Sequence, residues 1–117
     1  MSDALQPWGR WATFGLAAAA LLAGQMAALV ALTRALVYEL SGDNIRVNAV
    51  APTFVRTDLT ESIFSNPEKL AVVMQHTPLG RLPDPDDVAA AIVYLCSDAA
   101  RCVTGIVLPV DSGYLAR

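Results

Sequence analysis

The stretch from Trp11 to Thr33 constrains the fold most, because it holds no charged residue and is bracketed by Arg10 and Arg34. Its length would span a bilayer. However, alanine dominates the stretch, and it runs without a break into a helical pattern that ends at Leu40. Alanine favours a helix packed closely on a neighbour and adds little to lipid partitioning. We therefore predict a buried helix in a globular protein and not a membrane span, with a small membrane-associated protein as an alternative.

The composition is that of one compact domain. The 117 residues are 55% hydrophobic and 16% charged, far from the composition of disordered chains. A formal net charge of -3 without a Lys/Arg cluster argues against nucleic-acid binding. Cys96 and Cys102 lack the spacing of a zinc site or a disulfide framework, so we expect reduced thiols in a cytoplasmic protein.

Turn and strand signals divide the chain into an N-terminal arm (1–10), a long apolar helix (11–41) and a mixed region (42–117). The helix should stop near Ser41 and Gly42, because glycine adopts the left-handed conformation that ends helices. The run from Ile45 to Ala51 is rich in β-branched residues and predicts a strand, which Pro52 should end.

Two further helices and a second strand are predicted. Asn66-Pro67-Glu68 is a helix start, with the helix running to about His76, and Asp84-Pro85-Asp86-Asp87 repeats the signal. The second helix places Val88, Ile92, Leu95 and Cys96 on one stripe that should pack on a sheet. Residues 105–110 predict a short strand, which the turn Asp111-Ser112-Gly113 follows. This order of elements indicates an α/β architecture with parallel strands.

Several motifs, in the right order, resemble the C-terminal part of short-chain dehydrogenase/reductases, over all but the first quarter of the chain. The resemblance implies a truncated Rossmann-like fold: the C-terminal half of a doubly wound parallel sheet, rich in helix, with about two strands. Among the family's branches it is similar to sugar and polyol dehydrogenases and to acyl-carrier-protein reductases. The matching segments are Thr33-Arg34-Ala35-Leu36, Asn44-Ile45-Arg46-Val47-Asn48-Ala49-Val50, Thr77-Pro78-Leu79-Gly80-Arg81, Pro85-Asp86-Asp87-Val88-Ala89, Val103-Thr104-Gly105 and Val110-Asp111-Ser112-Gly113.

The family's chemistry needs groups that this sequence lacks. Its glycine-rich phosphate turn has no counterpart here, and Leu22 and Met26 stand at the positions of its catalytic Tyr and Lys. The only lysine, Lys69, has Ser65 four residues before it, so the pair is not relocated. We expect no catalytic residue and no cofactor for the chain alone, and NAD or NADP only where a partner chain completes the site.

One family element persists, the loop that lies near the nicotinamide in the family. By resemblance its candidate cofactor-binding residues are Pro52, Thr53, Val55 and Thr57, although Thr53 stands where glycine is common. Thr57 is the leading candidate for a carboxamide or phosphate contact. The role that we favour for Thr57 over such a contact is the N-terminal cap of a short helix over residues 58–63.

Other catalytic chemistry is not indicated. His76, the only histidine, is better explained as the end of a helix than as part of a hydrolytic triad. The acids Asp84, Asp86 and Asp87 start a helix and lack the spacing of a calcium site, so no metal is predicted.

Assembly follows from the apolar surface of the long helix. Exposing its large leucines (Leu16, Leu21, Leu22, Leu29, Leu32, Leu36) would cost on the order of 10 kcal/mol, comparable to the stability of a domain. We therefore expect a homodimer or higher homo-oligomer joined through the helix from Gly15 to Leu40, where Ala20, Gly24, Ala27 and Ala31 allow close approach. The sequence thus leaves three hypotheses: an impaired family member with a structural or interaction role, an oxidoreductase subunit completed by another chain, and a membrane-associated protein.

Overall fold

The computed structural model describes residues 23–116, with side chains from Ala27 onward. Its longer elements, in chain order, are α1 (Ala23–Leu40), β1 (Ala49–Pro52), α2 (Glu61–Phe64), α3 (Pro67–Gln75), α4 (Pro85–Cys96) and β2 (Val107–Val110). Two single turns of 3-10 helix, η2 (Ser41–Asp43) and η3 (Asp98–Ala100), follow α1 and α4.

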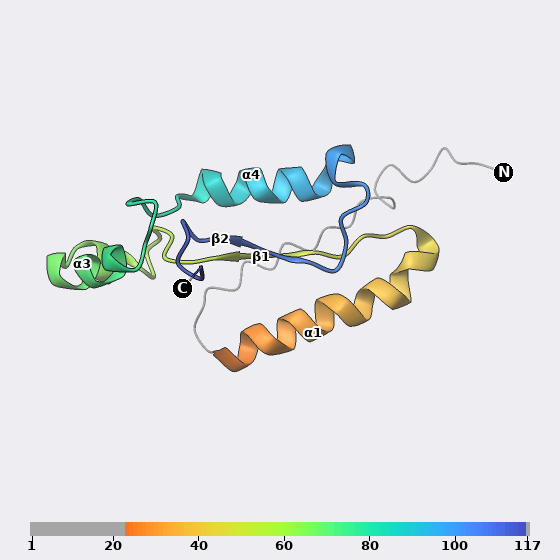
Figure 1. Ribbon diagram of the computed structural model, residues 1–117, viewed down its shortest axis with the longest axis horizontal. Helices are drawn as coiled ribbons and strands as arrows, with labels where there is room; N and C mark the ends of the chain where they lie inside the picture. Colours follow the sequence, from red (N-terminus) through yellow and green to blue (C-terminus); the bar gives the residue numbers. More distant parts are fainter. Residues whose placement is uncertain (1–22, 117) are drawn as a thin grey trace.

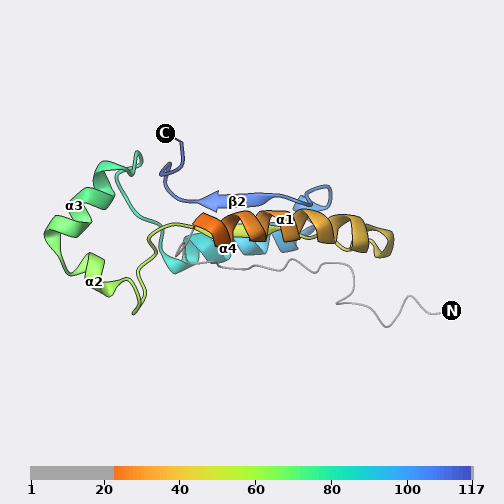
Figure 2. The same ribbon diagram turned by 90° about the horizontal axis from the view of Figure 1, so that it is seen from below.

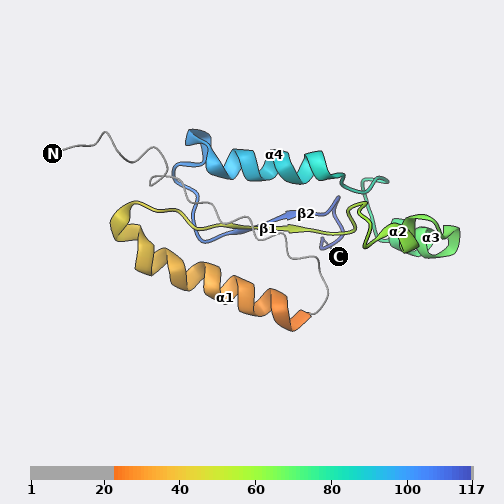
Figure 3. The same ribbon diagram turned by 180° about the vertical axis from the view of Figure 1, so that it is seen from behind.

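The elements form three layers. Helices α1 and α4 lie on opposite faces of the sheet formed by β1 and β2, as Figures 1 and 3 show from two sides. Helices α2 and α3 project beyond the end of the sheet toward which both strands run (Figure 2). The α/β class and the parallel pairing expected from the sequence are both confirmed.

The two strands pair in parallel, with Ala49 beside Val107 and Pro52 beside Val110. All four residues of β1 are buried, which is typical of a strand covered on both faces. The strand starts at Ala49, later than the predicted Ile45, because the preceding residues bond to a loop and not to β2. The amide of Val47 donates to the hydroxyl of Thr104 at 3.0 Å.

Helix α1 ends at Leu40, as predicted, but through a different residue. Asn44, with φ of 57°, takes the left-handed position that ends η2, and its amide donates to the carbonyl of Ser41. Gly42 is not in a positive-φ conformation, so the prediction that it provides the left-handed turn was wrong. Asparagine tolerates this conformation better than other non-glycine residues.

The predicted starts of α3 and α4 are confirmed by their caps. The Asn66 side chain accepts hydrogen bonds from the amides of Glu68 and Lys69. Asp84 begins α4 with a reciprocal capping box: its carboxylate accepts from the amide of Asp87, whose carboxylate accepts from the amide of Asp84. Proline occupies the first turn of both helices, where its missing N–H leaves no acceptor unpaired.

The core lies between α4 and the sheet. Val88 and Leu95 of α4 pack with Val50 of β1, and Val50 and Leu95 are fully buried. Ile92 adds to the same face, and Cys96 is half-buried. The predicted stripe of α4 is therefore confirmed. Among the described helices, none is long and apolar enough to cross a membrane.

Candidate functional site

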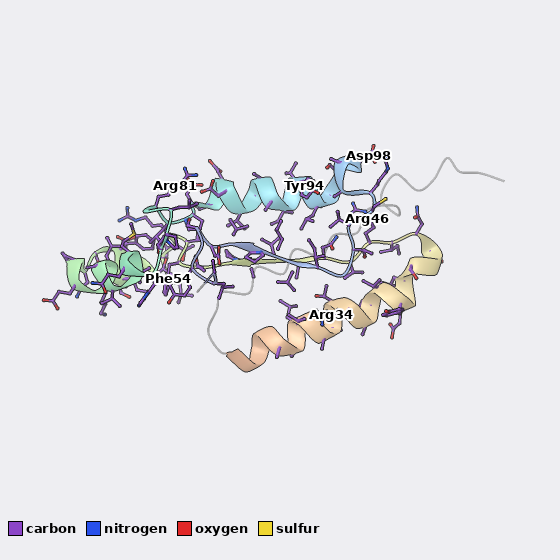
Figure 4. The ribbon with its side chains drawn as sticks, in the orientation of Figure 1. Arg34, Arg46, Phe54, Arg81, Tyr94 and Asp98 are labelled. Carbon is purple, nitrogen blue, oxygen red and sulfur yellow. The ribbon has the colours of Figure 1, made fainter. Side chains whose placement is uncertain are left out.

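The carboxyl ends of β1 and β2 define the candidate site. Because the strands are parallel, the loop after β1 (residues 53–60) and the turn after β2 (residues 111–114) emerge at the same edge of the sheet. Ligands of open α/β sheets bind at this edge. Figure 4 shows Phe54 at this end, beside the α2–α3 projection, and Arg46 at the opposite end.

The opposite end is held by two buried polar side chains. The Asn48 amide donates to the Val103 carbonyl at 2.8 Å, and its oxygen accepts from the amide of Ile106 at 3.3 Å. The Arg46 guanidinium donates to the carbonyls of Val103 at 3.1 Å and of Ser97 at 3.4 Å. Since these bonds join the entries to both strands, Arg46 and Asn48 are structural and lie far from the carboxyl edge. Both residues belong to a family motif in the sequence, but the sequence did not indicate their structural role.

Of the four residues predicted to approach a cofactor, Pro52 is buried as the last residue of β1, and Thr53 and Val55 are half-buried. The hydroxyl oxygen of Thr53 is buried without a hydrogen-bond partner among the described residues. Thr57 is exposed. The four residues therefore follow one another along the carboxyl edge, from the buried strand to solvent.

Thr60 fixes the conformation of this loop. Its hydroxyl donates to the Val55 carbonyl and accepts from the amide of Thr57 at 2.9 Å. The Thr57 hydroxyl lies 3.2 Å from the Thr60 hydroxyl. Helix α2 begins only at Glu61, so the prediction that Thr57 caps a helix over residues 58–63 was wrong. The neighbouring threonine takes up its amide and forms a non-helical turn instead.

A surface ion pair joins the loop to α2. The Arg56 guanidinium donates to both carboxylate oxygens of Glu61, at 3.1 and 3.2 Å, and lies 5.2 Å from the centre of the Phe64 ring. The hydrogen bond to Glu61, and secondly its negative charge, raise the pKa of Arg56 above its ordinary value. The pair is exposed, so it orients the loop more than it stabilises the fold.

The turn after β2 forms the second wall. Asp111 accepts from the amides of Gly113 and Leu115, both at 2.9 Å, and the Ser112 carbonyl accepts from the amide of Leu79. Tyr114 makes edge-to-face contacts with Phe54, at 5.8 Å between ring centres, and with His76, at 6.2 Å. Three distant segments of the chain thus meet at the carboxyl edge.

His76 is the C-cap of α3, as the sequence indicated. It is exposed and contacts a tyrosine ring. Among the described residues no group of His, Cys, Asp or Glu side chains could hold a metal ion.

A shallow hollow of about 350 Å³ lies next to this wall, lined by Leu79, Arg81, Asp87, Asp111 and Ser112 among others. None of the four predicted cofactor residues lines it. Both carboxylates on its rim already accept backbone hydrogen bonds. Leu22, at the family's Tyr position, lies outside the described residues, whereas Met26, at the Lys position, lies near the start of α1.

A parallel sheet with helices on both faces (Figure 1) defines this chain as an α/β protein. The family described as enoyl-(acyl carrier protein) reductase matches residues 12–115. A chloroplastic tropinone reductase homolog of Arabidopsis thaliana is 48% identical over 70% of this chain and 26% of its own length.

Solved structures agree. An oxidoreductase of the short-chain dehydrogenase/reductase family from Burkholderia thailandensis superposes with a TM-score of 0.74 at 39% identity, over 80% of this chain and 37% of that one. A 4-hydroxyisoleucine dehydrogenase complexed with NADH gives a TM-score of 0.78 at 36% identity, over 80% of this chain and 39% of that one. This chain belongs to the short-chain dehydrogenase/reductase family. It spans about a quarter to two fifths of the length of these relatives.

Proposed function

We propose that this chain does not carry out NAD(P)-dependent oxidation or reduction alone, and that its role is structural or interactive. The observation that carries the proposal is the chemistry of Leu22 and Met26 at the positions of the family's Tyr and Lys. Neither side chain can donate a proton to a substrate carbonyl or lower the pKa of a neighbour that does.

The carboxyl-edge loop fits only one end of a dinucleotide. Thr57 is exposed beside the half-buried Val55, and the hydroxyl of Thr53 is a buried polar group with its hydrogen-bonding capacity unused. These residues would contact the nicotinamide carboxamide of NAD or NADP, whose ring supplies or accepts a hydride when bound. They offer no cradle of successive backbone amides for the pyrophosphate, which dominates dinucleotide binding.

A second candidate is an oxidoreductase subunit whose site another chain completes. Burial of all four residues of β1 favours it, because continuous burial is characteristic of inner strands in wide parallel sheets. Within the described residues β1 pairs with β2 alone, so one of its edges has no strand partner there. A chain that added a strand along this edge could also bring a phosphate-binding turn.

Fluorescence titration of NADH and NADPH tests both candidates. We expect no saturable change with this chain alone, up to millimolar cofactor. Saturable binding in the micromolar range, or turnover of any ketone or polyol, would contradict the first proposal. The titration is then repeated with an added N-terminal part of a full-length relative. Binding that appears only in the mixture, and weakens with Thr57→Val more than with Thr57→Ser, would support the second candidate.

The proposed interaction role includes self-assembly through α1. Thr33, 4% exposed, faces the interior and donates to the Leu29 carbonyl at 2.8 Å. Ala27, Ala31 and Leu32 are exposed, with Leu32 at 51%. An apolar outer face with small residues suits close packing on a second helix, which supports a homodimer or higher homo-oligomer.

A further inference from the structure

We draw no further inference here: the strongest candidate, the outer edge of β1 at the buried Val50, has no strand partner among the described residues, and nothing in the structure shows what covers it.

Discussion

The side-chain amide of Asn48 reaches the carbonyl of Val103, 55 residues away in sequence, at 2.8 Å. The same side chain accepts from the amide of Ile106, so one buried residue links the entry of β1 to the loop that enters β2. A buried side chain with both polar atoms paired contributes to stability and also fixes strand register.

Replacing Asn48 by Ala should therefore lower the free energy of unfolding by ~2–4 kcal/mol, since two hydrogen bonds are lost and the amide of Ile106 loses its acceptor, whereas the Val103 carbonyl keeps its bond from Arg46. Urea unfolding followed by circular dichroism measures the change. Gln75→Ala, at an exposed position on α3, is the control and should stay within about 0.5 kcal/mol of the wild type. A comparable loss in both variants would show that Asn48 has no special role.

The cap of α4 gives a second prediction. Asp84→Ala removes the acceptor of two backbone amides and should cost ~0.5–2 kcal/mol, whereas Asp84→Asn keeps an acceptor oxygen and should cost less than half as much. Thermal unfolding of the two variants side by side measures the difference. If they melt at the same temperature, the cap is not what starts the helix.

Gly113 should tolerate no side chain. Its φ of +89° is strained for other residues, and a Cβ there would lie 3.0 Å from Cγ of Pro78. We expect Gly113→Ala to destabilise the fold by ~1–3 kcal/mol. Gly42→Ala is the matched control, because nothing lies within 4 Å of the added Cβ. Equal unfolding midpoints in urea for the two variants would contradict the expectation.

Assembly through α1 is tested by Ala31→Glu, which places a charge on the exposed apolar side of the helix. The variant should dissociate and unfold together, seen as a lower mass in light scattering and a lower melting temperature. Ala71→Glu, at an exposed alanine of α3, should leave both unchanged. A folded wild-type monomer at micromolar concentration would disprove this assembly.

The helix starts and the apolar stripe of α4 were predicted correctly, because they depend on residues that are close together in the sequence. Asn66 and Asp84 start their helices because a side chain two or three positions from an amide needs no tertiary contact to reach it. The stripe of α4 was predictable for the same reason, since the helical period is local.

Features that depend on hydrogen bonds to distant residues, or on competition between neighbouring side chains, were not predicted. The start of β1 shifted because Val47 bonds to Thr104, 57 residues away, before the strands begin to pair. At the candidate site, Thr57 does not cap a helix, because its amide donates to the hydroxyl of Thr60, three residues away, in a non-helical turn. The sequence did not indicate this competition between the two threonines. Likewise Asn44, and not Gly42, adopts the left-handed conformation. The reason is that the 3-10 helix η2 continues past Gly42, so the helical segment ends at Asn44.

The parallel pairing of β1 with β2 also has a kinetic consequence. Pairs such as Val47 and Thr104, 57 residues apart, give the fold a high contact order. Closing a loop of that length costs on the order of 3–4 kcal/mol of chain entropy before any strand contact forms. During synthesis β1 must wait until α3, α4 and the η3 turn have left the ribosome. During that interval the apolar segment from Val47 to Ala51 has no partner strand and is prone to aggregation. We expect chaperones to bind this segment before β2 is available.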